Sequence, residues 1–169
     1  MNPDLFWIPG PWRGSLAVAT RPRGGDWLED EAAGWRRAGL DVVVSLLENQ
    51  EAAQLDLVHE GDAAERNGVE FISFPIPDRG VPASTPAVLS LLRGIVGTLE
   101  EGKKVAVHCR QGIGRSGLIA AGVLMSSGIG AEKAIEAVSR ARGLAVPETP
   151  AQLDWIHHLP SERLAVTSS

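Results

Sequence analysis

One stretch of nine residues, from His108 to Ser116, constrains the fold of this chain more than any other part of its sequence. It contains His-Cys-Arg-Gln-Gly-Ile-Gly-Arg-Ser and lies between two apolar segments. Residues 105–107 are small or β-branched and follow a polar lysine pair, which is typical of a buried strand. Residues 118–125 carry no charge and predict a buried helix. The stretch is therefore a strand-to-helix loop that ends at a helix N-terminus.

The composition of this loop favours an anion-binding site. The first turn of a helix presents backbone N–H groups without partners in the helix, together with the positive end of the helix dipole. Gly112 and Gly114 allow positive φ angles, so successive N–H groups can point inward. Arg115 adds a planar guanidinium that can hold two oxygens of a tetrahedral anion. The residues expected to contact that anion are Arg110, Gln111, Gly112, Ile113, Gly114 and Arg115.

Cys109 opens the loop and is the candidate nucleophile. A helix N-terminus and a nearby arginine both favour a thiolate, so we expect the pKa of this thiol to lie below its ordinary value. A lone cysteine is more often a small buried apolar residue. Here, however, the two glycines, the arginine and Ser116 all stand where nucleophilic chemistry on a tetrahedral anion needs them.

The pattern Gly112-x-Gly114-x-x-Gly117 also matches the glycine fingerprint of dinucleotide-binding proteins. That fingerprint requires a second parallel strand that ends in an acidic residue about 20 positions further on. The corresponding position lies near Glu132, in a helical pattern with no strand after it. We therefore expect no dinucleotide cofactor.

His-Cys, five residues and then Arg-Ser resembles the signature of the cysteine-dependent protein tyrosine and dual-specificity phosphatase superfamily. His108, Cys109, Arg115 and Ser116 carry this resemblance, which spans roughly residues 16–159 but is most specific over 108–117. It implies a phosphocysteine intermediate, a general-acid aspartate on a mobile loop and no metal or cofactor. Because His157 and His158 are adjacent and no cysteine or acid completes a zinc spacing, the residues themselves also argue against a metal site.

Asp78 is the candidate general acid. Three prolines exclude a helix or an interior strand over residues 75–82, so Asp78 lies on an exposed loop hinged at Gly80, similar to the position of the acid in dual-specificity phosphatases. One well-placed carboxylic acid typically contributes about 10²–10⁴-fold to a rate. The same carboxylate could then activate the water that cleaves the phosphocysteine. The alternative is an ordinary Asp-Arg-Gly turn.

Three further residues have roles that the resemblance implies or that the sequence leaves open. Ser116 would donate a hydrogen bond to the departing thiolate, although its hydroxyl could equally satisfy the first turn of the helix. His108 is expected to hold the loop through a backbone carbonyl and to support the low pKa of the thiol. Gln152 either orients the hydrolytic water or caps the last helix in a capping box with Thr149.

Charged residues outside the signature are more weakly specified. Glu48 follows a predicted strand and could pair with Arg115, but a solvated loop acid is the favoured interpretation. Arg21, Arg23 and Arg79 could recognise anionic groups beside the phosphate, and for each of them solvated surface is favoured.

The remaining pattern predicts an α/β fold, a phosphatase-type three-layer sandwich with a central, mostly parallel sheet of about four to five strands flanked by helices. Asp26 with Glu29 predicts a capped helix start, and Thr85 before Pro86 predicts another. Residues 5–12 are expected to form an N-terminal strap or edge strand. Further strands are expected at 16–19, 40–47, 69–74 and 105–107; helices are expected at 26–39, twice within 48–67 with a break near 59–61, and at 85–102, 118–125, 131–142 and 150–158.

Length and composition predict one domain, with residues 1–14 as the strap, a core of about 15–159 and a flexible tail over 160–169. A net charge of −5 without a basic run excludes nucleic acid and anionic membranes as expected partners. The longest uncharged stretch, 116–131, is shorter than the roughly 20 residues of a membrane span. A single cysteine and an N-terminus without signal-peptide features favour the cytoplasm, and we expect a monomer.

The predicted function is metal-independent hydrolysis of a phosphorylated protein or a small phosphomonoester. The signature loop lacks the lysines of inositol-lipid phosphatases, which favours phosphotyrosine or mixed phosphoprotein substrates. Two alternatives stay open. A sulfurtransferase or reductase could use the same cysteine loop, but it would need a thiol relay and would not need Asp78. A phosphate-binding module without turnover would keep the loop and usually lose the nucleophile or the acid.

Overall fold

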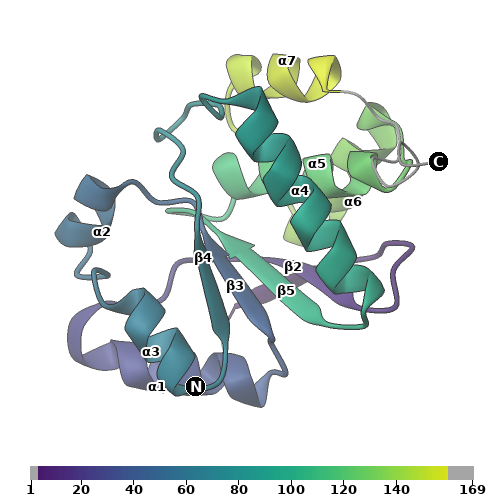
Figure 1. Ribbon diagram of the computed structural model, residues 1–169. Helices are drawn as coiled ribbons and strands as arrows, with labels where there is room; N and C mark the ends of the chain where they lie inside the picture. Colours follow the sequence, from purple (N-terminus) through teal and green to yellow (C-terminus); the bar gives the residue numbers. More distant parts are fainter. Residues whose placement is uncertain (1–3, 160–169) are drawn as a thin grey trace.

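The computed structural model describes residues 4–159, in which five strands form one sheet covered by helices on both faces (Figure 1). The strands are β1 (Leu5–Ile8), β2 (Ser15–Ala19), β3 (Val42–Ser45), β4 (Glu70–Ser73) and β5 (Lys104–His108). The helices are α1 (Leu28–Arg37), α2 (Asn49–Gln54), α3 (Glu60–Arg66), α4 (Thr85–Glu100), α5 (Arg115–Ser126), α6 (Ala131–Arg142) and α7 (Pro150–His158), and a short 3-10 helix, η1 (Gly25–Trp27), precedes α1.

The central strand of the sheet is β5. The strand order is β1-β2-β5-β3-β4, and every neighbouring pair is parallel except β1 and β2. Residues 105–108 of β5 are all buried, as expected of a parallel strand that is covered on both faces. This confirms the predicted α/β fold with a mostly parallel sheet. It also brings the loop after β5 to the middle of the carboxyl edge of the sheet, where open α/β sheets bind their ligands.

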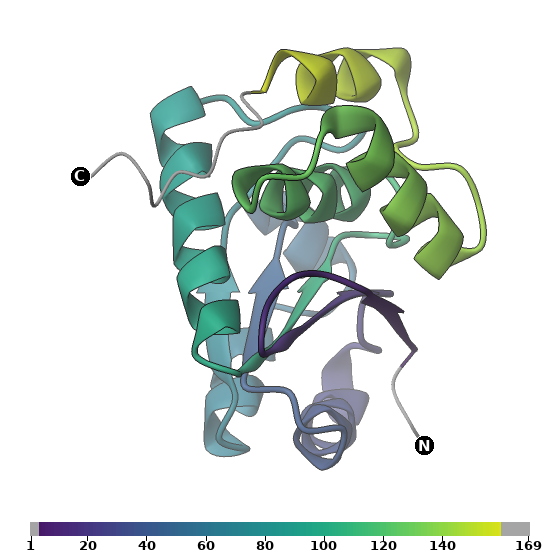
Figure 2. The same cartoon turned by 90° about the vertical axis from the view of Figure 1, so that its right-hand side faces the viewer.

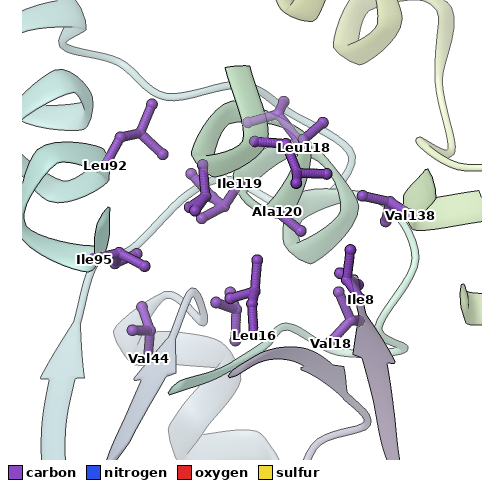
Figure 3. Close-up of a cluster of buried hydrophobic side chains, with 14 of the residues drawn as sticks. Ile8, Leu16, Val18, Val44, Leu92, Ile95, Leu118, Ile119, Ala120 and Val138 are labelled. Carbon is purple, nitrogen blue, oxygen red and sulfur yellow. The ribbon is translucent and has the colours of Figure 1, made fainter. Parts of the chain in front are cut away.

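Apolar side chains form a separate core on each face of the sheet. On one face, α4, α5 and α6 pack over the strands and α7 packs against α5, and Figure 3 shows Ile119 and Ala120 of α5 above Leu16 of β2. On the other face, α1 and α3 cover the sheet, and Trp35 of α1 is buried there. The sheet is therefore the middle of three layers.

Helix α5 carries both the core and the start of the candidate site. Every residue from Arg115 to Ser126 is buried, which explains why the sequence has no charge after Arg115 in this helix. Leu118, Ile119 and Leu124 have no exposed surface. Although α5 is so apolar, no helix within residues 4–159 has the length and hydrophobicity needed to cross a membrane.

Two predicted helix starts are wrong. Asp26 lies inside η1, and α1 begins at Leu28 without a side-chain cap, because a hydrogen bond from Gly25 N to Asp56 O at 2.9 Å anchors a tight turn just before it. Helix α4 is capped by Ser84, whose Oγ accepts a hydrogen bond from Ala87 N at 3.3 Å. The sequence Ser-Thr-Pro fits either cap register, since proline is tolerated throughout the first helical turn.

Element boundaries differ by a few residues elsewhere. The break between the two short helices covers residues 55–59 and so reaches the predicted position at its end; Asp56 has a φ of 60° just after α2, and α3 starts at Glu60. β3 and β4 are shorter than predicted. Part of the predicted strap is an edge strand, β1, antiparallel to β2. The predicted tail over 160–169 and the first three residues of the strap lie outside the described residues.

Candidate active site

The site is built on the loop between β5 and α5, residues 109–114. Cys109 directly follows the central strand and is 3% exposed. Its sulfur lies 3.0 Å from Ser116 Oγ, in the first turn of α5. Gly112 has a φ of 73°, as the loop composition predicts, whereas Gly114 has a φ of −76° and does not use the positive φ that glycine allows. A Cβ on Gly112 would lie 2.9 Å from Ala19 O. The structure therefore brings the thiol, the glycine turn and the start of the helix together.

The surroundings of Cys109 stabilise its thiolate. Burial by itself raises the pKa of the thiol, because a charge loses hydration in the interior. Hydrogen bonds from the hydroxyl and N–H of Ser116 and from the N–H of Gly112, together with the positive charge of Arg115, outweigh this effect. The pKa of Cys109 therefore lies below its ordinary value.

Arg115 is held by a buried carboxylate, Glu51, that no local sequence pattern singles out, because it lies 64 positions away. Its Nη1 and Nη2 donate to the two oxygens of Glu51 at 2.6 and 3.0 Å, and Nη1 also donates to Ile76 O at 2.9 Å. Burial lowers the pKa of the guanidinium, but the hydrogen bonds to Glu51 and the nearby negative charges raise it by more. The pKa of Arg115 therefore lies above its ordinary value, and Arg115 remains a cation. For Glu51, burial raises the pKa, and the hydrogen bonds from Arg115 and from Glu48 N bring it below the usual range.

The candidate partner Glu48 does not pair with Arg115. Glu48 is the exposed N-cap of α2, and its backbone N–H donates to Glu51 Oε1 at 3.0 Å. Glu51 lies one turn further along α2, and there the helix turns it towards Arg115. The favoured interpretation of Glu48 as a loop acid therefore agrees with the structure.

Asp78 lies across from Arg115 on the loop between β4 and α4. Its Oδ1 is 3.1 Å from Arg115 Nη2, and half of its side chain is exposed. Two contacts hold the residues of this loop that follow Asp78. Gly80 O accepts a hydrogen bond from Gln152 Nε2 at 3.1 Å, and Arg79 Nη1 lies 3.3 Å from Glu148 Oε2. The predicted loop position of Asp78 is thus beside the signature loop.

Gln152 has the capping geometry and a second contact. Its Oε1 accepts from Thr149 N at 3.1 Å, and Thr149 Oγ1 accepts from Gln152 N at 3.2 Å, which completes the capping box. The amide is fully buried, and a Cβ on Gly114 would lie 3.0 Å from Gln152 Oε1. Gln152 therefore caps α7, lies against the signature loop and holds the Asp78 loop at once.

His108 and Glu60 form a buried pair behind the loop. Nε2 of the ring contacts the Glu60 carboxylate, and Nδ1 lies 3.2 Å from Cys109 O, so the predicted contact of His108 with a backbone carbonyl is present. Burial lowers the pKa of His108, but the charge of Glu60 and its hydrogen bond raise it above the ordinary value. No local pattern singles out Glu60, because its partner lies 48 positions away.

These elements enclose a cavity of about 230 Å³. Its lining combines three cationic and two acidic side chains with the thiol and loop backbone: Asp78, Arg79, Cys109, Arg110, Gln111, Gly114, Arg115 and Glu148. Arg79 is the only one of the three weaker arginine candidates in this lining. Arg23 instead pairs with Glu31 at 3.0 Å, and Arg21 is exposed. Within residues 4–159, no group of three or more histidine, cysteine, aspartate or glutamate side chains is placed to hold a metal ion.

Comparison with known families decides where this site belongs. The sequence profile of a family described as "Polymorphic toxin system, DSP-PTPase phosphatase" matches residues 17–129, which is most of the chain and contains the whole signature loop. The chain belongs to the DSP/PTP phosphatase family. Its recognised resemblance to cysteine-dependent tyrosine and dual-specificity phosphatases is thereby confirmed.

Individual phosphatases of known structure agree with this assignment. The crystal structure of Tk-PTP in its active form is 36% identical, with a TM-score of 0.77 over 94% of this chain and 97% of that chain. A crystal structure of kinase-associated phosphatase, with serine in place of its catalytic cysteine, has a TM-score of 0.83 over 93% of both chains. At 19% identity, the second likeness shows the fold alone.

Curated relatives are longer. The 197R protein of Invertebrate iridescent virus 6 is 29% identical over 158 residues, which are 91% of this chain and 56% of that protein. Cyclin-dependent kinase inhibitor 3 of Rattus norvegicus is 29% identical over 110 residues, 64% of this chain and 51% of that protein. The chain thus spans about half the length of the curated relatives it matches.

Proposed function

We propose that this protein hydrolyses phosphomonoesters in two steps through a phosphocysteine on Cys109. The observation that carries the proposal is the arrangement of three groups around one cavity: a buried thiol with a lowered pKa, the paired cation Arg115, and Asp78 opposite it at 3.1 Å. A nucleophile, an anion-binding group and a proton donor are the groups that phosphoryl transfer from an ester needs.

In the first step, the thiolate of Cys109 attacks phosphorus, and the bond between phosphorus and the ester oxygen breaks. The carboxylic acid of Asp78 gives its proton to that oxygen, which leaves as an alcohol or phenol. The loop N–H groups and the guanidinium hold the equatorial oxygens. Nη2 of Arg115 donates a hydrogen bond to Asp78 Oδ1. An incoming phosphate oxygen replaces the Asp78 carboxyl group as the acceptor for Nη2. Asp78 is then free to turn to the ester oxygen.

In the second step, water attacks the phosphocysteine. The carboxylate of Asp78 takes the proton of the water, the phosphorus–sulfur bond breaks, and phosphate leaves. Ser116 Oγ, at 3.0 Å from the sulfur, donates to the departing thiolate and makes it a better leaving group. The site thereby returns to its starting protonation state.

We propose phosphorylated proteins, with phosphotyrosine or mixed specificity, as the substrate class. Support comes from the match to the family described as a DSP-PTPase phosphatase, and from a signature loop without lysine. Transfer of sulfur is the weaker alternative, because Cys109 is the only cysteine in the chain and a thiol relay would need a second one.

The test is release of phosphate from an aryl phosphate in the presence of EDTA. Cys109→Ser is expected to abolish turnover, and Asp78→Asn to lower it by about 10²–10⁴-fold and to remove the basic limb of the pH–rate profile. Asp154→Asn makes the same chemical change on an exposed part of α7 and is expected to leave turnover unchanged. Activity that survives in Cys109→Ser would refute the nucleophile assignment.

A further inference from the structure

Arg142, the last residue of α6, binds the backbone of the signature loop and is not among the residues that line the cavity. Its Nε donates to Gly112 O at 3.0 Å, and its Nη2 donates to Gln111 O at 3.1 Å. These two acceptors are successive carbonyls at the tip of the loop. One guanidinium therefore holds two adjacent peptide groups.

The geometry of the peptide bond makes this contact relevant to the site. In a trans peptide unit, the C=O of one residue and the N–H of the next point in opposite directions. The carbonyls of Gln111 and Gly112 belong to the peptide units that carry the N–H groups of Gly112 and Ile113. When Arg142 holds both carbonyls from outside, both N–H groups face inward. In agreement with this orientation, the N–H of Gly112 is one of the groups that lower the pKa of the Cys109 thiol.

The loop backbone does not fix this orientation by itself. Gly112 has a φ of 73°, and glycine crosses between positive and negative φ with little steric cost. Its carbonyl could therefore turn inward, towards the cavity, which would place a partial negative charge beside the thiolate and a bound phosphate. Two charge-assisted hydrogen bonds to the outward carbonyls oppose that rotation.

Arg142 is itself held in place by the strand at the edge of the sheet. Its guanidinium carbon lies 4.2 Å from the centre of the Phe6 ring, in β1. α6 packs against β1, as Figure 2 shows where the pale green helix meets the dark purple strand. Gly143 has a φ of 81° and ends α6 directly after Arg142. The stacked ring and the helix end together present the guanidinium fork to the loop.

We infer that Arg142 is a positioning residue that keeps the N–H groups of Gly112 and Ile113 turned towards the phosphate and the thiolate. This inference rests on the proposed function of the loop as a phosphoryl-transfer site. It assigns to the C-terminus of α6 and to Phe6 a role in a reaction whose atoms they do not touch.

Arg142→Met tests the inference, because it removes both donors and keeps an unbranched side chain of similar length. Arg140→Met is the matched control in the same helix, since Arg140 is exposed and pairs only with Glu136 within the described contacts of residues 4–159. Two properties are measured: the affinity for inorganic phosphate by calorimetry, and the pH dependence of Cys109 alkylation by iodoacetamide. Neither requires turnover.

Arg142→Met is expected to weaken phosphate binding by about 10- to 100-fold and to shift the alkylation profile to higher pH, while Arg140→Met matches the wild type. Arg142→Lys keeps the positive charge but not the planar pair of donors, so an intermediate loss of phosphate affinity is expected. This variant also tests the positioning role if Arg142→Met does not fold. Wild-type phosphate affinity and alkylation in both Arg142 variants would overturn the inference.

The outcomes also separate this inference from the proposed function. If the wild type releases no phosphate from the ester but Arg142→Met still shifts the alkylation profile, the proposed hydrolysis fails and the positioning role stands. If the wild type hydrolyses the ester and Arg142→Met is indistinguishable from it in both measurements, the positioning role fails and the hydrolysis stands.

Discussion

At the scale of single residues, the site depends on a cation that is buried with its counterion. Arg115 and Glu51 are both buried, and breaking such a pair leaves an uncompensated charge in the interior. We expect Glu51→Ala to lower the free energy of unfolding by about 3–5 kcal/mol in urea titrations. Glu48→Ala changes an exposed side chain that does not pair with Arg115, and it should change the free energy of unfolding by no more than about 0.5 kcal/mol. A larger loss for Glu48 than for Glu51 would contradict the observed pairing.

The second residue-scale prediction concerns pH. Because the folded-state pKa of His108 lies above its ordinary value of 6.5, the protonated ring contributes stability that is complete below pH 6.5 and is lost as the pH rises through the raised pKa. Glu60→Gln removes the charge that raises this pKa. The excess stability of the wild type over Glu60→Gln should therefore shrink as the pH rises above 6.5, measured by urea unfolding at a series of pH values. A stability difference between the two proteins that stays constant over this pH range would contradict the raised pKa of His108.

At the scale of elements, the Asp78 loop is held by α7 through Gln152 and Gly80. We expect Gln152→Met to release this loop and to slow turnover, with a larger loss for esters of basic alcohols than for activated aryl esters, because basic leaving groups need the general acid more. Steady-state rates across a series of leaving groups measure this dependence.

Thr149→Val is the control for that experiment. It removes the hydroxyl that caps α7 and leaves the Gln152 amide to bind Gly80 O, so it should cost about 1 kcal/mol of stability without the leaving-group effect. If Thr149→Val and Gln152→Met change the rates equally, the cap and not the loop contact explains the result.

The elements were largely predictable because their signals are local. Apolar runs gave β3 and β5, and an uncharged helical run gave α5. The cap of α4 was misplaced by one residue because Ser84 and Thr85 carry the same hydroxyl chemistry. Partners close in sequence, such as Thr149 for Gln152, were predictable, but the distant partners of the site residues were not. Glu51 lies 64 positions from Arg115, and Arg142 lies 30 from Gly112, so only the tertiary fold brings them together.

At the scale of the whole molecule, one helix joins the site to the core. α5 presents Arg115 to the cavity and Ser116 to the sulfur of Cys109, and it packs its remaining residues between the sheet and the neighbouring helices. The signature loop spans the gap between the central strand and this helix. Its anion-binding geometry should therefore exist only while the three layers are assembled, and an oxyanion bound there should stabilise the whole fold rather than the loop alone.

The linkage between binding and folding predicts how much bound phosphate stabilises the fold. Inorganic phosphate at 100 times its dissociation constant should raise the free energy of unfolding by about 2.7 kcal/mol, since the unfolded chain lacks the site. Urea titrations with and without phosphate measure the rise. Arg115→Met should remove it, whereas Arg23→Met, which lies outside the cavity, should keep it in full. If Arg115→Met retained the same rise, phosphate would be binding elsewhere, and the cavity between the Asp78 loop and α5 would not be the anion site that couples to folding.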